Sequence, residues 1–140
     1  MTSETLAMSE HVSAENLTGV WQGLYSYPYG QSVSFVATLI DSGASFSGMI
    51  HEPSIFGGDA IYATLAGTRQ DSAVSFVKTY EKSAGPEYAA SVQYEGALNG
   101  DATEIEGRWT IRSVGLSGKF LMIRSAGKAV EVEQKVSERV

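Results

Sequence analysis

Seven side chains with binding or acid–base potential fall at alternate positions within short runs of this sequence. A tyrosine hydroxyl both donates and accepts hydrogen bonds, and a carboxylate beside an ammonium can hold a charged group or move a proton. Together they suit a pocket for a small, partly apolar ligand that bears one charged group. The candidate ligand-binding residues are Tyr25, Tyr27, Glu52, Lys78, Tyr80, Tyr94 and Trp109.

A purely structural role is the alternative for each of these residues. A buried charge costs several kcal/mol unless it is paired. An ion pair between Glu52 and Lys78 at the open end of the fold would therefore account for both charged residues without a ligand. The tyrosines are also typical of half-buried core positions whose hydroxyls reach water. We expect His51 on the outward face.

The composition excludes several kinds of chemistry. The chain has no cysteine and only two histidines, His11 and His51, so we predict no metal site and no disulfide. No nucleophile triad or phosphate-binding loop is present, and we assign no catalytic residue and no cofactor.

The formal net charge of −6 argues against nucleic-acid binding, because an acidic chain repels phosphate backbones. No apolar run is long enough to cross a bilayer, so we expect no membrane partner. Residues 1–10 lack the basic and apolar regions of a secretory signal, and we expect a cytoplasmic protein.

Short alternating runs account for most of the chain from Leu17 onward, and turn-forming residues such as Asn99-Gly100-Asp101 separate them. Eight successive strands with short connections favour an all-β, antiparallel up-and-down barrel over a sandwich, because closure removes exposed edges. We expect a barrel domain over residues 17–125, an N-terminal arm over 1–16 and a C-terminal tail over 126–140. The predicted strands are residues 19–26, 33–40, 45–52, 60–68, 73–80, 88–98, 104–112 and 118–124.

Alternation assigns one aromatic-rich face of each strand to the barrel interior. For the fourth strand the pattern is ambiguous, and we place Ile61, Ala63 and Leu65 inward. Antiparallel order places Tyr25, Tyr27, Glu52, Lys78 and Tyr80 at one end, with Tyr94 and Trp109 nearer the middle.

The outward face of the last strand and the first two strands is apolar. Soluble monomers rarely leave such a patch open, so we expect the C-terminal tail, with Val130, Val132 and Val136, or a second subunit to cover it. A homodimer is the favoured arrangement. The patch comprises Val20, Leu24, Val36, Ile40, Leu121 and Ile123.

Three short motifs resemble the calycin superfamily, and its avidin and streptavidin branch above all. Residues 17–21 read Leu-Thr-Gly-Val-Trp at the start of the first strand, Phe46-Ser47-Gly48 gives a later F-x-G strand, and Arg124 closes the last strand. The resemblance implies that Arg124 stacks on Trp21 and closes one end of the barrel.

The same resemblance argues against biotin as the ligand. The positions at which avidins hold biotin correspond to Gly23, Tyr27, Ile50 and Glu52, and several pocket tryptophans are missing. A site built for hydrogen bonds loses most of its affinity when those partners go. Related haem-binding barrels use a histidine near the chain end, and none follows His51, so we expect no haem.

Three functions remain open. The first is a small-molecule-binding barrel, and the second is a filled barrel that associates through its outer surface. The third is a small acid–base enzyme, since some calycin-like decarboxylases place a Tyr-x-Tyr and a glutamate inside the barrel; here Tyr25, Tyr27 and Glu52 fit, although the surrounding motifs are absent. We favour a protein that is not an enzyme.

Overall fold

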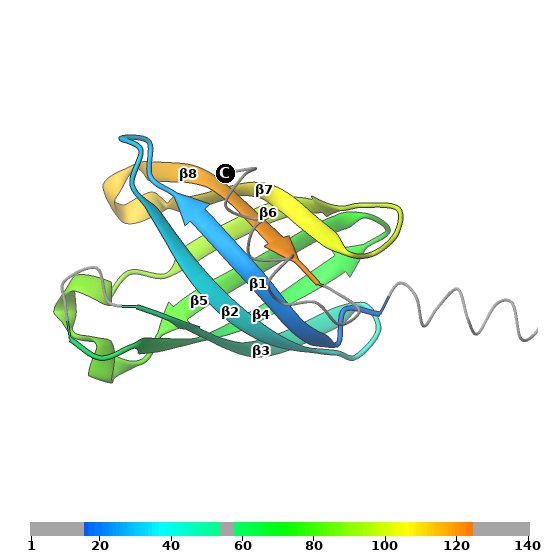
Figure 1. Cartoon of the computed structure of the whole chain (residues 1–140), viewed down its shortest axis with the longest axis horizontal. Helices are drawn as coiled ribbons and strands as arrows, with labels where there is room; N and C mark the ends of the chain where they lie inside the picture. The colour runs from blue at the N-terminus through cyan, green and yellow to red at the C-terminus, as the bar shows by residue number, and fades with distance from the viewer. Residues whose placement is uncertain (1–15, 54–57, 125–140) are drawn as a thin grey trace, which may run out of the picture.

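The computed structural model describes residues 16–53 and 58–124, which form a closed barrel of eight antiparallel strands. Each strand pairs with its neighbours in chain order, and the last strand pairs with the first (Figure 1). The predicted up-and-down barrel is therefore confirmed. The strands are β1 (Gly19–Ser26), β2 (Ser32–Asp41), β3 (Ser45–Glu52), β4 (Ile61–Gln70), β5 (Ala73–Tyr80), β6 (Val92–Leu98), β7 (Glu104–Ile111) and β8 (Leu116–Ile123).

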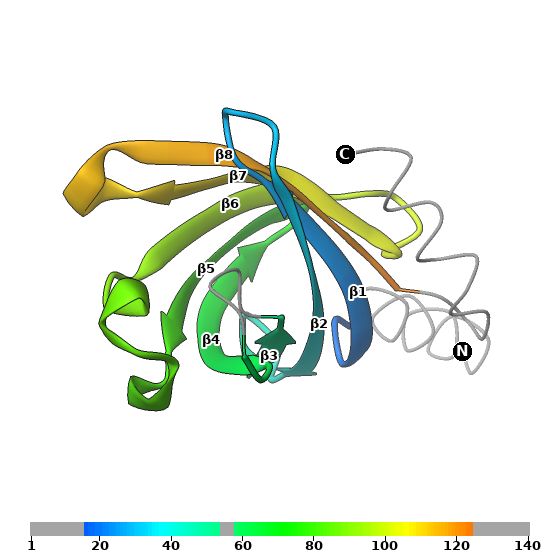
Figure 2. The same ribbon diagram turned by 60° about the vertical axis from the view of Figure 1, so that its left-hand side comes forward.

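The turns follow the local chemistry of their residues. Between β2 and β3, the Asp41 carboxylate accepts a hydrogen bond from the Gly43 amide, and Gly43 adopts a positive φ of 101°. Between β6 and β7, the Asn99 side chain accepts hydrogen bonds from the amides of Thr103 and Glu104. Turned by 60°, the strands curl round a common interior (Figure 2).

The largest difference from the predicted strands lies before β6. Residues 88–91 were expected in this strand, but the strand begins at Val92. Gly85 has a φ of 100°, and Pro86 opens a short 3-10 helix, η2 (Pro86–Tyr88), that follows η1 (Lys82–Ala84). Proline supplies the fixed φ for a helical start and removes an amide from the ladder. A third such helix, η3 (Arg112–Val114), joins β7 to β8.

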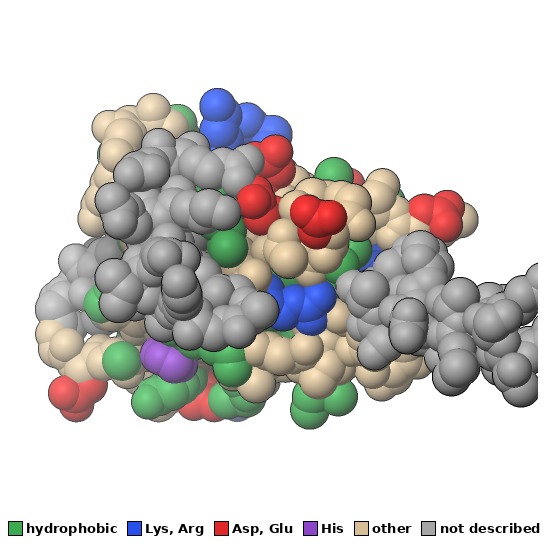
Figure 3. All heavy atoms as spheres, turned by 45° about the vertical axis from the view of Figure 1, so that its right-hand side comes forward, with side chains coloured by type: hydrophobic (Ala, Val, Ile, Leu, Met, Phe, Trp, Pro, Cys, Tyr) green, Lys and Arg blue, Asp and Glu red, His purple; other side chains and the backbone are tan. Residues whose placement is uncertain are grey.

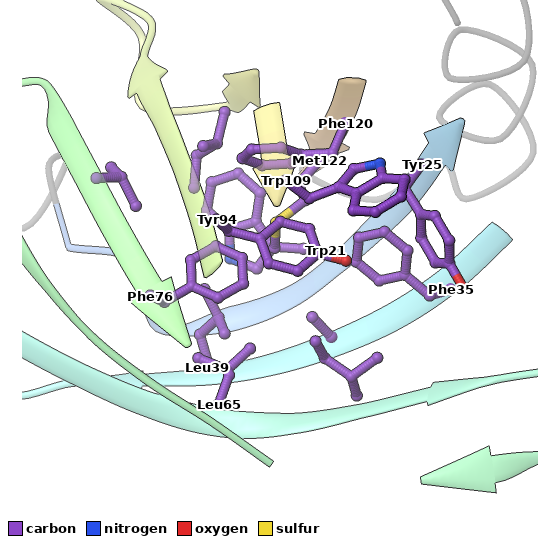
Figure 4. Close-up of a cluster of buried hydrophobic side chains, with 14 of the residues drawn as sticks. Trp21, Tyr25, Phe35, Leu39, Leu65, Phe76, Tyr94, Trp109, Phe120 and Met122 are labelled. Atoms are coloured by element: carbon purple, nitrogen blue, oxygen red, sulfur yellow. The ribbon is translucent and has the colours of Figure 1, made fainter. Parts of the chain in front are cut away.

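The inward face of the barrel is filled by large apolar side chains (Figure 4). The inward placement of Ile61, Ala63 and Leu65 on β4 is confirmed, since all three are buried. Close packing depends on small residues between the large ones: a side chain at Gly23 would overlap the ring of Phe35. The rings and side chains that converge in Figure 4 include Trp21, Phe35, Leu39, Leu65, Phe76, Tyr94, Phe120 and Met122.

The outer apolar patch divides into a buried part and an exposed part. Leu24, Leu121 and Ile123 form a buried cluster of their own. Val36 is half-buried, whereas Val20 and Ile40 are 55% and 61% exposed. Residues 1–15 of the arm expected over 1–16, and the whole tail expected over 126–140 with its three valines, lie outside the described residues.

His51 is exposed on the outer face, as expected. Its ring is 6.0 Å from that of Tyr62. The face of the molecule in Figure 3 carries hydrophobic side chains interspersed with charged ones. The described part of the chain contains no helix with the length and apolar character of a membrane-spanning segment. Within the same residues, no group of three or more His, Asp or Glu side chains is placed to hold a metal ion.

Candidate functional site: the tyrosine-lined mouth of the barrel

One end of the barrel carries the polar interior residues. It lies where β1, β3, β5 and β7 end and where β2, β4, β6 and β8 begin, because the strands alternate in direction. The connections at this end include the turn before β2 and the three 3-10 helices. We call this end the mouth.

Glu52 is the centre of a buried hydrogen-bond network at the mouth. It occupies the last position of β3 and is only 2% exposed. The hydroxyls of Tyr25 and Tyr80 each donate a hydrogen bond to Oε1, both over 2.8 Å. Lys78 Nζ lies 3.4 Å from Oε2. Burying the carboxylate is tolerable because three donors surround it.

Lys78 is held by aromatic rings as well as by this carboxylate. Its Nζ lies 4.5 Å from the ring centroid of Tyr25, 4.6 Å from that of Tyr80 and 5.3 Å from that of Tyr94. The side chain is 1% exposed, so the ring faces replace the water that would solvate an exposed ammonium. The predicted contact between Glu52 and Lys78 is therefore confirmed.

A cavity of about 300 Å³ opens beside this network. Half of the fourteen residues that line it are aromatic, and Lys78 and Glu87 are its charged members. The lining residues are Tyr25, Tyr27, Tyr29, Lys78, Tyr80, Glu87, Tyr88, Ala90, Val92, Tyr94, Trp109, Ile111, Val114 and Leu116.

Two groups of rings form the sides of the cavity. On one side Tyr27 stacks on Tyr29, with centroids 5.1 Å apart and planes 11° apart, and meets Trp109 edge-on at 5.3 Å. On the other side, Tyr80 lies 4.7 Å from Tyr88 of η2. The ring faces are apolar, with hydroxyl groups at the tyrosine edges, and the planes of Tyr80 and Tyr88 are tilted by 54° to each other.

Trp109 is locked in place by its own hydrogen bond. Its indole nitrogen donates to the Ser26 carbonyl over 3.0 Å, although β8 lies between β7 and β1. Gly118 on β8 permits this reach, because a Cβ there would lie 2.7 Å from the indole nitrogen. The indole therefore offers a ring surface to the cavity, and its N–H is already used.

Burial sets the protonation of the site. It raises the pKa of Tyr25 and of Tyr80 well above the usual tyrosine range, and the Glu52 charge adds to the effect. Burial also raises the pKa of Tyr94, so all three hydroxyls remain protonated donors. Burial lowers the pKa of Lys78 to about 8, against the opposing attraction of Glu52.

Six of the seven predicted site residues line the cavity, and the seventh, Glu52, is bound to three of them. The prediction missed Tyr29, Glu87 and Tyr88, which lie in the connections rather than in strands. The sequence held a signal for these residues. Antiparallel order places the connection after the first strand and the connection after the fifth strand at the mouth, with the predicted site residues. The Tyr-Pro-Tyr-Gly and Gly-Pro-Glu-Tyr segments are turn sequences with aromatic residues.

A larger hollow, of about 540 Å³, lies against the outer side of β1, β2 and β3. Its lining includes the outward residues Gln22, Leu24, Ser34, Val36 and His51. The one carboxylate in its lining, Glu52, is already committed to Tyr25, Lys78 and Tyr80. The mouth cavity, which is lined by Lys78, Glu87 and several tyrosines, is therefore the better candidate for a binding site.

The opposite end of the barrel is closed by a stacked pair. Arg124 lies 4.6 Å from the ring centroid of Trp21, which confirms the predicted stacking. The guanidinium donates hydrogen bonds to the carbonyls of Asn16, Thr18 and Ala102. The Trp21 indole donates to the Leu17 carbonyl over 2.9 Å.

No protein-family model matches the chain, and no curated protein matches it. Its fold is similar to that of designed β-barrels. A redesigned β-barrel aligns with a TM-score of 0.66 at 18% identity, covering 82% of this chain and 95% of the design. The redesigned barrel mFAP1, solved bound to the small molecule DFHBI, gives 0.65 at 17% identity over 81% of this chain and 99% of that one. A further barrel, mFAP2b, also bound to DFHBI, gives 0.62 at 13% identity over 82% of this chain and 98% of the design. At these identities the likeness establishes the fold alone, a closed eight-stranded barrel.

Proposed function

We propose that this protein binds a flat, mainly apolar small molecule in the mouth cavity, with one polar group of the ligand directed at Lys78. The observation that carries the proposal is the cavity itself, in which seven aromatic residues surround a path to a buried Glu52–Lys78 pair. Concave, mostly apolar sites with a few convergent polar groups are typical of small-molecule binding.

The aromatic ring faces that line the cavity favour a flat ligand that can pack against them. The stacked Tyr27 and Tyr29 face one side of the cavity, and Tyr80 and Tyr88 face the other. A volume of about 300 Å³ is at the lower end of the range for small-molecule sites. That designed barrels of the same fold bind the dye DFHBI supports this choice.

The charges at the site indicate whether the polar group of the ligand is charged or neutral. Glu52 already neutralises Lys78, so a fully charged ligand would add an unpaired charge to a buried site. A neutral acceptor such as a carbonyl oxygen adds none. The Lys78 ammonium has three N–H donors, of which Glu52 takes one, so it has donors left for such a group. The ligand is therefore better matched by a neutral polar group than by the charged group expected from sequence.

A titration with 2-naphthalenemethanol, a flat neutral probe, tests the proposal. We expect saturable binding that quenches tryptophan fluorescence, because Trp109 lines the cavity. Replacing Tyr88 by alanine removes one wall and should weaken binding roughly 3- to 10-fold, the value of one aromatic contact. The control is Tyr62→Ala, since Tyr62 is 47% exposed on the outer face of β4 and is outside the cavity lining.

Binding that is absent, or equally weakened by both substitutions, would reject the mouth as the ligand site. Native mass spectrometry of freshly purified protein would in addition reveal any retained small molecule and the size of the assembly.

The relation to avidins is also a proposal, and it concerns the construction of the barrel rather than its ligand. The stacked Trp21 and Arg124 support it. Gly23 and Ile50 offer no side-chain hydrogen bond where biotin would need one, and Glu52 already accepts three. We expect no heat of binding when biotin is titrated into the protein.

Association through the outer face is the second candidate function. Exposed Val20 and Ile40, together with half-buried Val36, favour contact with a second copy. Light scattering on the full chain tests this, and a monomer at high concentration would reject the homodimer.

A further inference from the structure

We propose that Lys78 is a covalent attachment point, condensing with an aldehyde or ketone ligand in the mouth cavity to form an imine. The inference rests on the proposed function, since it identifies the polar group of that same ligand as a reactive carbonyl. It assigns Lys78 a chemical role in addition to pairing with Glu52.

The first support is the position of Nζ. Lys78 is the charged residue that β5 places inside the barrel, and it both lines the cavity and is 1% exposed. A carbonyl compound that enters between the tyrosine walls therefore meets this amine at the inner end of its path. The rings around Nζ exclude bulk water, which protects an imine from hydrolysis.

The second support is the availability of a free amine. Burial lowers the pKa of Lys78 to about 8. Roughly a tenth of its molecules are then neutral at pH 7, against well under a thousandth for an exposed lysine. Neutral amines are the nucleophiles of imine formation, and lysines desolvated in apolar pockets are the usual examples.

The neighbouring groups suit each step of the condensation. Tyr25 and Tyr80 are protonated and donate to Glu52, and the ring of Tyr94 on β6 lies 5.3 Å from Nζ. Tyr27, in the connection after β1, lines the same cavity. Glu87 and Tyr88 lie further out, on η2. Glu52 Oε2, 3.4 Å from Nζ, is within reach to relay a proton.

The chemistry balances without a redox partner. The Nζ lone pair forms a bond to the carbonyl carbon, the C=O π pair moves to oxygen, and one amine proton is transferred from nitrogen to that oxygen. The hydroxyl then leaves as water with the remaining amine proton, and a C=N bond forms. The products are one imine and one water molecule.

Charge conservation is the third support. Protonation of the imine restores a cation at the position of the original ammonium. Glu52 therefore keeps a partner in the covalent complex, and no buried carboxylate is left unpaired. An attachment that removed the positive charge, such as acylation, would lack this advantage.

Reductive trapping with 2-naphthaldehyde tests the inference on the full chain. Protein and aldehyde are incubated at pH 7.5 with sodium cyanoborohydride, and the product is analysed by intact mass and peptide mapping. We expect one adduct, with the mass of the aldehyde less one oxygen, on the peptide that contains Lys78. Modification there should be at least 10-fold faster than at Lys82 or Lys119, which are exposed.

Three variants make the outcome specific. Lys78→Arg keeps the cation for Glu52 but removes the nucleophile, so the adduct should disappear. A double variant, Lys78→Met with Glu52→Gln, should also give none, and it supplies a folded test protein if the arginine does not fit. Lys119→Arg changes an outward residue of β8 and should leave the Lys78 adduct unchanged.

The pH dependence of trapping gives an independent readout. The rate at Lys78 should level off near pH 8, whereas the rates at Lys82 and Lys119 should continue to rise toward pH 10. Adducts spread over the lysines according to exposure, or persisting in Lys78→Arg, would overturn the inference.

The unreactive alcohol separates this inference from the proposed function. If 2-naphthalenemethanol binds to wild type but the aldehyde gives no Lys78 adduct, covalent attachment is wrong and the binding site stands. If the alcohol does not bind and no adduct forms, both proposals fail.

Discussion

The two ends of this barrel each place a cation against aromatic rings, but they satisfy the cation in different ways. At the closed end Arg124 lies over Trp21 and donates to three backbone carbonyls. At the mouth Lys78 lies over three tyrosine rings and pairs with one carboxylate. Carbonyls are fixed acceptors that do not titrate, whereas burial lowers the pKa of Lys78 to about 8.

This difference separates a structural end from a chemical one. The closed end even draws on a strained residue, since Ala102 has a φ of 58° and supplies one of the carbonyls for Arg124. The mouth instead keeps its ion pair beside a cavity of about 300 Å³. Substitutions at the closed end should therefore act on stability alone, and those at the mouth on stability, pH response and binding.

The largest effect should come from Trp21→Ala. The side chain is fully buried and is covered by Arg124, so truncation should lower the free energy of unfolding by about 3–5 kcal/mol. Denaturant unfolding measures it, with Trp21→Phe as a control that keeps much of the buried surface. A loss below about 1 kcal/mol would show that the closed end does not depend on this residue.

At the mouth, removing Lys78 alone should cost more than removing both charges. Lys78→Met leaves Glu52 buried with two tyrosine hydroxyls and no cation, and we expect a loss of about 3 kcal/mol. The double variant Lys78→Met, Glu52→Gln also removes the unpaired carboxylate charge, so it should recover part of the lost stability. Unfolding of the wild type, both single variants and the double variant completes the cycle. Additive losses would mean that the two charges are not coupled.

The sequence pattern was sufficient to predict the eight strands, apart from the start of β6, together with the interior and the contact between Glu52 and Lys78. Alternation assigns Glu52 and Lys78 to the interior, and strand direction assigns both to one end, so their meeting follows from these two rules. The same reasoning places Trp21 and Arg124 at the other end. Period-2 patterns are reliable here because a one-residue slip would expose a whole strand face.

The remaining features depend on geometry that alternation does not contain. The outer patch divides because β8 pairs only with Gln22 to Ser26 of β1, so Val20 lies beyond the end of β8 while Leu24 lies opposite Leu121. Such offsets follow from strand tilt in closed barrels. Tyr29 lies in a connection, where no periodicity indicates direction, and Tyr88 lies in η2 rather than in the strand predicted over residues 88–98.

The pH dependence of stability should also distinguish the mouth from the closed end. The pKa of Lys78 is lowered to about 8 in the folded protein, so the unfolded state binds more protons above that pH. The cost of burying the ammonium is therefore fully present below pH 8. It is relieved as the pH rises from 8 toward the pKa of Lys78 in the unfolded state. Stability should increase relative to the double variant by up to about 1.4 kcal/mol per pH unit near pH 9.

The comparison is best measured between pH 7.5 and 9.5. Above that range the unfolded tyrosines ionise while Tyr25, Tyr80 and Tyr94, whose pKa values are raised by burial, stay protonated, and stability falls again. If the free energy of unfolding changes with pH at the same rate in the wild type and in the double variant, Lys78 keeps its proton throughout this range.

The smallest effect should come from Arg124→Lys, which tests whether the closed end needs a charge or a shape. A lysine keeps the cation near the Trp21 ring, but its single ammonium does not reproduce the planar fork that reaches the carbonyls of Asn16, Thr18 and Ala102. Arg124 is partly exposed, so water can replace some of these bonds, and we expect a loss of about 1 kcal/mol in denaturant unfolding. The pH dependence and the affinity for 2-naphthalenemethanol should not change, because neither depends on this end. A variant that altered ligand affinity while leaving stability intact would mean that the two ends are coupled through the barrel wall, and the division between them would have to be abandoned.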